Sequence, residues 1–362
     1  MKTEQIPQLT SLRFFAAASI VFFHLQGYII GGLDVRFATG VSFFFVLSGF
    51  ILSHSYRDFS TRSIGDFYFG RFARIWPVHA VTFVLIIVLV QPYEFDFTSA
   101  ALAGINLTLL QSWLPLNGTT LSFNGLSWSI SAEMAFYAVF PVLARSRHFY
   151  LWYAALAALA FSIVLTMQIA NPAQGSGVWG LNPISVILQH PAVRCIEFAT
   201  GMLAWRLHDR LRASSTIAWT VAELAAVAVV AAFLLTSHMI EACLHSVDLL
   251  RRWYSQAGGM FSFALAIATF AHGRGAISAG LRWRPLVLLG KISFSTYMIH
   301  EIVIRAAMKY GLPGLIGVRG SVALILAAVY ILSYLLWALV ETRAQRALMT
   351  RRRHSLLIPS PA

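Results

Sequence analysis

Long apolar segments recur along almost the whole chain. Of its 362 residues, 58% are hydrophobic and 11% are charged, whereas soluble domains carry roughly 25% charged residues. A helix of about 20 apolar residues is long enough to cross a bilayer. We therefore predict an all-α fold, a polytopic membrane helical bundle of about ten transmembrane helices. The predicted spans are residues 11–30, 38–57, 72–90, 126–143, 149–169, 184–205, 215–236, 255–272, 285–309 and 319–341.

Arginine-rich clusters between these spans indicate their orientation. If the apolar stretch 98–114 does not cross the membrane, every dense cluster falls on one side, and the bias of basic loops towards the cytoplasm places both termini inside. We therefore interpret residues 91–125 as an external loop with a re-entrant or interfacial helix, residues 1–345 as the membrane domain and residues 346–362 as a basic cytoplasmic tail. The clusters are Arg57 to Arg74, Arg145 with Arg147, Arg206 to Arg212, Arg274 to Arg284, and Arg343 to Arg353.

The net charge of +13 has the same explanation. The arginines lie between apolar segments and near the C-terminus, which fits loops that face anionic lipid. We expect the lipid bilayer as a partner and no nucleic acid. Cys195 and Cys243 lie far apart in the sequence and form no metal or redox motif, so we expect no metal site.

Arg13 and His24 are eleven residues apart in the first predicted span. This is close to three helical turns, so both side chains leave the same helix face about 16 Å apart along the axis. Ionisable groups at such depth usually face a polar interior and mark a pathway or a reaction centre. The first span is therefore expected to face the interior of the bundle through this stripe.

Two later spans carry polar stripes at helical spacing. The predicted topology brings Glu133 and His300 to the outer half of the membrane, at a depth similar to that of His24. A histidine with a carboxylate partner is a plausible general base, but a hydrogen-bonded network that fixes helix packing is an alternative. Both readings stay open for His24 and Glu133, whereas packing is favoured for His300. The stripes are Ser129, Glu133 and Tyr137, and Ser293, Tyr297 and His300.

Arg71 and Arg74 lie one helical turn apart, and we expect them at the cytoplasmic face. Paired arginines can hold phosphate through bidentate, charge-assisted hydrogen bonds. The alternative is that they set topology beside lipid phosphates. Arg194 and Glu197, also one turn apart, are expected to neutralise each other. The small residues Ser42, Ser48 and Gly49 are expected to allow close helix packing.

Taken together, these segments resemble the acyltransferase-3 family of membrane O-acyltransferases, and the resemblance covers nearly the whole chain. LTSLRFFAAASIVFFH matches that family's Arg-x10-His first helix, and GVSFFFVLSGFILS its Phe-Phe-x-x-Ser-Gly second helix. Five such motifs occur in the expected order. The other three are RFARIWP, LSWSISAEMAFY and LGKISFSTYMIH, the last with Phe294 where the family often has Tyr.

The resemblance implies transfer of an acyl group, usually acetyl, from cytoplasmic acyl-CoA to a hydroxyl of an exported polysaccharide, lipid-linked sugar or lipo-oligosaccharide. It also implies a bacterial inner (cell) membrane location, no permanently bound cofactor, and a link to polysaccharide synthesis or export machinery. Some relatives carry a fused external SGNH domain after the helical core, and we expect none here.

Family and residue pattern together predict a layout for the reaction. Arg71, Arg74 and Arg13 would hold the phosphates of coenzyme A, and the thioester would reach His24. His24 would deprotonate the acceptor hydroxyl or accept the acyl group itself. Glu133 would orient the imidazole or hold the acceptor. Ser129, Tyr137, Tyr297 and His300 are expected to contact substrate or support these groups.

Two other functions compete with this prediction. Polar residues at mid-membrane depth also serve transporters and flippases, although the paired arginines favour the enzyme. A non-catalytic component of a polysaccharide-export complex would not need His24, so the complete set of motifs counts against it.

Overall fold

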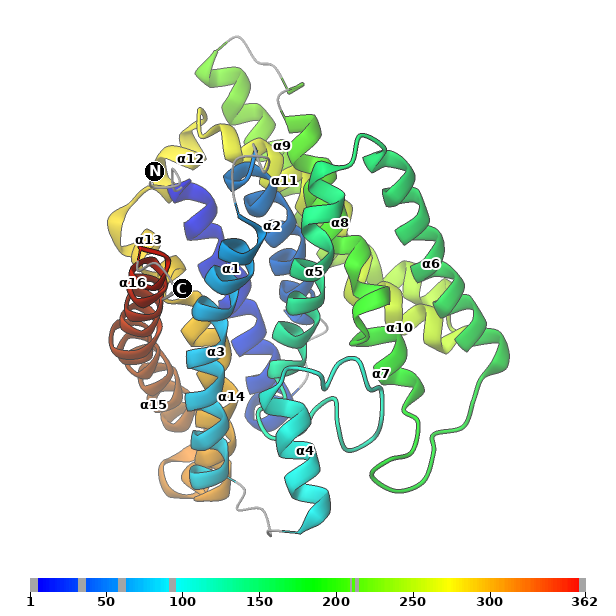
Figure 1. Ribbon diagram of the computed structural model, residues 1–362, viewed down its shortest axis with the longest axis vertical. Helices are drawn as coiled ribbons and strands as arrows, with labels where there is room; N and C mark the ends of the chain where they lie inside the picture. Colours follow the sequence, from blue (N-terminus) through cyan, green and yellow to red (C-terminus); the bar gives the residue numbers. More distant parts are fainter. Residues whose placement is uncertain are drawn as a thin grey trace, which may run out of the picture.

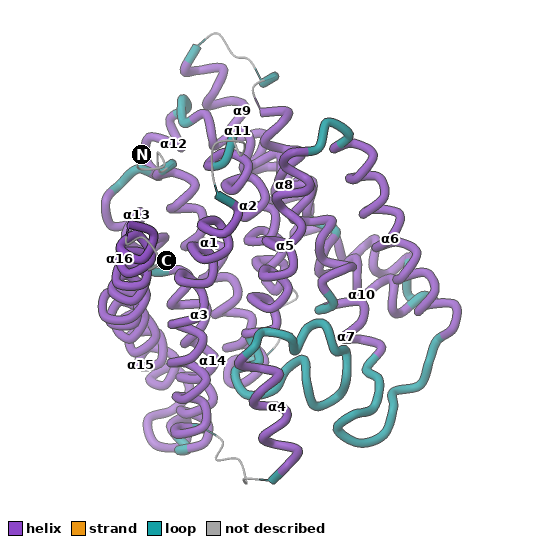
Figure 2. The backbone as a smooth tube through the Cα atoms, in the orientation of Figure 1, coloured by secondary structure: helices purple, strands orange, loops and turns teal. Residues whose placement is uncertain are grey.

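In the computed structural model, the chain is described for residues 6–31, 37–57, 63–90, 96–208, 210–211 and 215–357, with side chains up to Arg352. The described part is almost entirely helical and contains no strand beyond one isolated bridge between Leu116 and Leu181 (Figure 2). The predicted all-α helical bundle is confirmed.

The helices follow one another with short connections. They are α1 (Pro7–Leu25), η1 (Gln26–Ile30), η2 (Phe37–Thr39), α2 (Gly40–Ser55), α3 (Ile64–Leu89), α4 (Phe97–Leu107), α5 (Ser127–Arg145), α6 (Phe149–Ala170), α7 (Pro183–Leu188), α8 (Pro191–His208), α9 (Thr216–Cys243), α10 (Asp248–Ala257), α11 (Met260–His272), α12 (Ala276–Leu281), α13 (Arg284–Lys291), α14 (Ser293–Lys309), α15 (Leu312–Leu336), η4 (Trp337–Glu341) and α16 (Thr342–Leu357).

Seven helical segments in the described residues are long and apolar enough to cross a membrane, and α13 with α14, bent by 62°, makes an eighth. The two other predicted spans, 184–205 and 255–272, are each broken. Pro191 starts a new helix, α8, which is mostly buried and carries the charged pair Arg194 and Glu197. A helix enclosed by others needs no continuous apolar surface. The second segment is divided between α10 and the 13-residue α11.

Only residues 98–107 of the apolar stretch 98–114 are helical, and they belong to α4, which has 11 residues. At about 1.5 Å per residue it is about 16 Å long, roughly half of the hydrocarbon core of a bilayer. It begins with a capping box in which Asp96 accepts a hydrogen bond from the Ser99 amide at 2.7 Å. The prediction that this stretch does not span is consistent with its length.

The close packing of α2 on α8 depends on small residues. A Cβ atom at Gly49 would collide with the carbonyl oxygen of Phe198, and one at Gly201 would collide with that of Val46. These two glycines therefore let the two backbones meet, as predicted for Gly49. The contact fixes α2, which forms one wall of the site described below.

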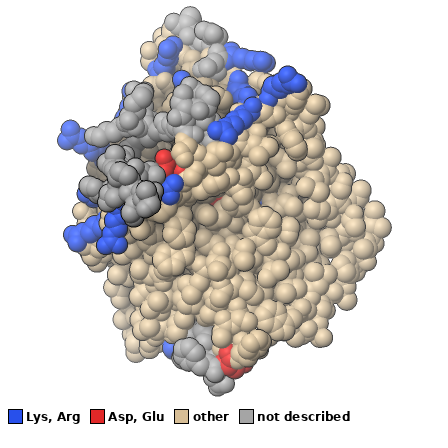
Figure 3. All heavy atoms as spheres, viewed as in Figure 1, with Lys and Arg blue, Asp and Glu red and all other residues tan. Residues whose placement is uncertain are grey.

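The charged helix ends gather on one side of the molecule. Figure 1 shows that α5 and α8 end, and α3 and α9 begin, in the upper part of the view. Lys and Arg atoms gather there on the face drawn in Figure 3, whereas the middle of that face is nearly free of charge. This pattern is that of a multi-pass membrane protein. Residues 346–357 of the predicted tail continue α16, where Arg352 Nε lies 2.7 Å from Asp66 Oδ1 of α3.

Candidate active site

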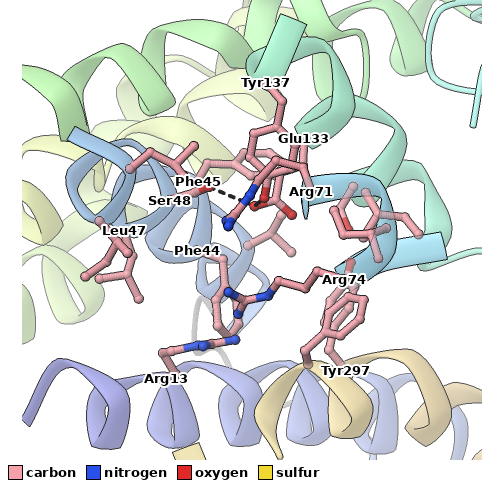
Figure 4. Close-up of a pocket in the computed structure, with 17 residues that line it drawn as sticks. Arg13, Phe44, Phe45, Leu47, Ser48, Arg71, Arg74, Glu133, Tyr137 and Tyr297 are labelled. Atoms are coloured by element: carbon pink, nitrogen blue, oxygen red, sulfur yellow. Dashed lines mark hydrogen bonds between the residues drawn. The ribbon is translucent and has the colours of Figure 1, made fainter. Parts of the chain in front are cut away.

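Five helices, α1, α2, α3, α5 and α14, enclose a cavity of about 130 Å³ in the bundle. Figure 4 shows its polar side chains converging from these helices. We call it the donor cavity. Among its lining residues are seven of the nine predicted site residues, whereas His24 and His300 lie outside it. The seven are Arg13, Arg71, Arg74, Ser129, Glu133, Tyr137 and Tyr297.

The three arginines direct their charge into the donor cavity (Figure 4). Within the described residues, neither Arg13 nor Arg74 has a hydrogen-bond partner, and the buried Arg71 Nε also lacks one. The guanidinium of Arg71 lies over the ring of Tyr137, 5.9 Å from its centroid. Three cations with unused N–H donors around one small cavity form a site for an anion.

Arg71 and Arg74 lie inside α3 rather than in a loop before it. They follow Ile64, the first residue of α3, by seven and ten positions, which is about 11–15 Å along the helix. The sequence segment before them looked like a loop because it contains charged and glycine residues, yet α3 begins earlier. The anion site therefore lies within the helical bundle, and its place at the cytoplasmic face stays a prediction.

Glu133 is held by two hydroxyl groups rather than by a histidine. Ser48 Oγ donates to Glu133 Oε1 at 2.8 Å, and Tyr137 Oη donates to the same oxygen at 2.5 Å. The structure thus differs from one of the two expectations for Glu133, that it orients His24. The other expectation, that Glu133 holds the acceptor, stays a prediction. Ser48 is a site residue that sequence reasoning assigned to packing only, because its partner lies 85 positions away on another helix.

His24 pairs with His300. Its Nδ1 lies 3.1 Å from His300 Nε2 and 3.0 Å from the Ile20 carbonyl oxygen, while His300 Nδ1 lies 3.1 Å from the Thr296 carbonyl oxygen. A carbonyl only accepts, so His300 Nδ1 carries a proton, and in its neutral form its Nε2 then accepts a hydrogen bond from His24 Nδ1. This tautomer assignment leaves a lone pair on His24 Nε2. His24 is therefore oriented as a base or nucleophile.

Tyr297 stands between the histidine pair and the donor cavity. It lines the cavity, and its ring centroid is 6.0 Å from that of His300. Its hydroxyl donates to the Leu126 carbonyl at 3.1 Å, and Ser129 Oγ donates to the same carbonyl at 3.0 Å. The donor cavity and the histidine pair are thus adjacent, and Tyr297 contacts both.

Arg194 and Glu197 form the expected internal pair. Arg194 Nε lies 2.7 Å from Glu197 Oε2, and both side chains are almost fully buried. The guanidinium also lies 5.6 Å from the Trp128 ring and 5.3 Å from the Phe45 ring. The pair therefore fixes α8 against α2 and α5. Within the described residues, no group of three or more His, Cys, Asp or Glu could hold a metal ion.

Comparison with known proteins agrees with this geometry. Residues 6–338 match the acyltransferase domain that defines the acyltransferase-3 family. The chain is 30% identical to the acyltransferase MdmB of Streptomyces mycarofaciens over 99% of its own length and 96% of that protein. It is 23% identical to YrhL of Bacillus subtilis (strain 168), provisionally assigned as a peptidoglycan O-acetyltransferase, over 83% of its own length and 48% of that protein.

No solved structure shows a significant match to the chain. The family match extends from the start of α1 to the end of the last long apolar helix and includes every residue of the donor cavity and the histidine pair. The chain therefore belongs to the acyltransferase-3 family and is a membrane O-acyltransferase.

Proposed function

We propose that this enzyme transfers an acyl group, acetyl being expected, from acyl-CoA to a hydroxyl of a glycan or lipid-linked saccharide at a bacterial inner membrane. The observation that carries the proposal is the donor cavity, where guanidinium groups without hydrogen-bond partners among the described residues adjoin an oriented histidine pair. Coenzyme A carries phosphates at one end and the thioester at the other. A molecule of this kind can bind in the donor cavity through its phosphates while its thioester reaches the histidine pair.

The arginines provide donor binding. Their N–H groups suit phosphate oxygens, and bonds to charged groups contribute about 1.5–3 kcal/mol each. Entry from the cytoplasm fits the charged helix ends on the side where α3 begins. The pantetheine arm would then extend past Tyr297 towards His24. The surrounding apolar helices exclude water and protect the thioester from hydrolysis.

The histidine pair provides the chemistry. In direct transfer, His24 Nε2 takes the proton of the acceptor hydroxyl while the oxygen attacks the thioester carbonyl, and coenzyme A leaves as the thiolate. In the alternative, His24 Nε2 itself accepts the acyl group and passes it on. His300 positions His24 in both routes through the bond between their rings. Glu133 holds Ser48 and Tyr137 in the cavity wall.

The relatives support a glycan as the acceptor. One relative is named for peptidoglycan, a glycan with free hydroxyls. The C-terminal end of α1, whose last turn contains His24, lies away from the charged helix ends (Figures 1 and 3). An acceptor that reaches His24 from the outer side would meet the thioester without crossing the donor cavity. Both termini would then be cytoplasmic, and a glycan-export system could supply the acceptor.

The test combines the purified enzyme with cells. Purified protein in lipid should transfer label from [¹⁴C]acetyl-CoA to glycan extracted from a deletion strain. The glycans of that strain should lack O-acyl groups that the parent carries and regain them with the intact gene but not with His24→Ala. Identical O-acyl content in parent and deletion strain, with no transfer in vitro, would reject the proposal.

A further inference from the structure

A buried carboxylate, Glu341, lies just behind the wall of the donor cavity. It is the last residue of η4, and 7% of its surface is exposed. Ser295 Oγ on α14 donates a hydrogen bond to Glu341 Oε2 at 2.8 Å. The residue before Ser295 is Phe294, which lines the cavity. Glu341 is therefore held on the cavity side of the last long helix.

The backbone around Glu341 is adapted to this position. Residues Trp337–Glu341 form a π-helical turn between two α-helical stretches, and such a turn rotates the side chains that follow it relative to a continuous α-helix. This turn packs against α3, the helix of Arg71 and Arg74. Single π-turns inside α-helices frequently occur at functional sites. Here the turn brings a carboxylate to the helix that carries two cavity cations.

The charge of Glu341 acts on the donor cavity. When ionised, Glu341 attracts the guanidinium groups of Arg74 and Arg13, and these two arginines repel each other. Cations inside a membrane protein are costly unless an opposite charge lies nearby. Glu133 supplies one such charge in the cavity wall, and Glu341 supplies a second one from behind it. Its carboxylate is held by Ser295 and is not displaced into the cavity.

We propose that Glu341 is a fixed counter-ion that neutralises Arg13 and Arg74 while the cavity is empty and so limits how tightly an anionic donor binds. The inference rests on the proposed acyl-CoA donor. The phosphates of the donor compete with this built-in negative charge, and so does the free coenzyme A that remains after transfer. Glu341 thereby keeps the product weakly bound, and the site can release it.

The first test measures the dissociation constant of acetyl-CoA for the full-length enzyme in lipid nanodiscs. Glu341→Gln should bind acetyl-CoA about tenfold more tightly, the order of magnitude expected when one like charge near an anion is removed at an effective dielectric constant of about 20. Inhibition by free coenzyme A should strengthen by a similar factor. S-acetylpantetheine, which has no phosphate, should bind the variant and the wild type equally well.

Two control variants separate this effect from a general change in charge or fold. Glu241→Gln removes a charge from another buried carboxylate on α9, which does not line the cavity, and it should leave acetyl-CoA affinity unchanged. Glu341→Asp keeps the charge and should stay close to the wild type. If Glu341→Gln does not fold, Glu341→Met is equally uncharged and suits an apolar helix, so it gives the same measurement.

Unchanged or weaker acetyl-CoA binding by Glu341→Gln would overturn the inference, and so would equal tightening of S-acetylpantetheine or equal tightening in Glu241→Gln. If the wild type does not bind acetyl-CoA at all, the proposed donor fails instead. Inorganic pyrophosphate then replaces it as the probe. Tighter pyrophosphate binding by Glu341→Gln would support the counter-ion, and equal binding would reject it.

Discussion

The donor cavity and the histidine pair lie side by side but are built in opposite ways. In the cavity, charged side chains carry unused hydrogen-bond donors, and Arg13 and Arg74 have no hydrogen-bond partner among the described residues. In the pair, each ring is fixed by a backbone carbonyl and by the other ring. The unused N–H donors of the arginines can bind an anionic ligand, whereas the fixed rings hold His24 Nε2 in position to accept a proton. The difference separates binding from chemistry within one active site.

The largest expected effect is on the rate of the acyl-transfer step, which we assign to His24. His24→Ala should lower acyl transfer by at least about 10²-fold, because it removes the proposed base or nucleophile. The affinity for acetyl-CoA should stay near that of the wild type, since His24 does not line the donor cavity. Turnover and thermal stability of purified variants in lipid measure this. A folded variant with near wild-type turnover would exclude His24 as the base or nucleophile and leave His300 as the candidate.

On the binding side, Arg71→Ala and Arg74→Ala should each weaken acetyl-CoA affinity by about tenfold or more, because each removes a charged hydrogen bond of about 1.5–3 kcal/mol. Lysine at either position should restore binding only in part, since it lacks the planar fork. Isothermal titration with acetyl-CoA reports the loss. Unchanged affinity in a well-folded double variant would contradict the assignment.

A change at Tyr297, the side chain shared by both regions, should have a smaller effect on turnover. Tyr297→Phe removes the hydrogen bond to the Leu126 carbonyl but keeps the ring between the cavity and His300. One neutral hydrogen bond is worth about 1 kcal/mol, so we expect turnover to fall about fivefold with little change in acetyl-CoA affinity. Steady-state kinetics on the purified variant tests this. A loss as large as that of His24→Ala would mean that the hydroxyl itself takes part in the reaction.

The substitution with the smallest expected effect on activity tests on which side of the membrane α4 lies. Phe97, at the start of α4, is 89% exposed, and a cysteine there should react with an impermeant maleimide added outside intact cells. The exposed Cys243 is first replaced by serine to remove its background, whereas Cys195 is buried. Labelling only after the cytoplasmic side is opened would contradict the predicted topology. The histidine pair would then not lie in the outer half.

The helical architecture could be predicted because hydrophobic length alone identifies a lipid-exposed helix. The bounds were most accurate for α6, whose apolar surface faces outward: residues 149–169 were predicted, and the helix is Phe149–Ala170. The prediction was less accurate for α8, since a helix enclosed by others carries Arg194 and Glu197 and escapes the hydropathy signal. The early start of α3 was missed for a related reason, because its first turns are polar.

The members of the site could be predicted from their spacing, but their pairing could not. Spacing places Ser129, Glu133 and Tyr137 on one face of α5, and the bond between Tyr137 and Glu133 follows from it. Contacts between helices depend on rotation and packing that the sequence does not encode locally. For this reason the sequence did not predict that Ser48, rather than His24, lies beside Glu133. It also did not predict the bond between Ser295 and Glu341.

The central claim is that binding and chemistry belong to two separate regions, and a crossed comparison tests it most directly. Acetyl-CoA affinity and single-turnover transfer rate are measured on Arg74→Ala and His24→Ala in the same lipid. Arg74→Ala should lose affinity and keep its transfer rate at saturating donor, while His24→Ala should keep its affinity and lose its transfer rate. Equal loss of both quantities in both variants would contradict the account.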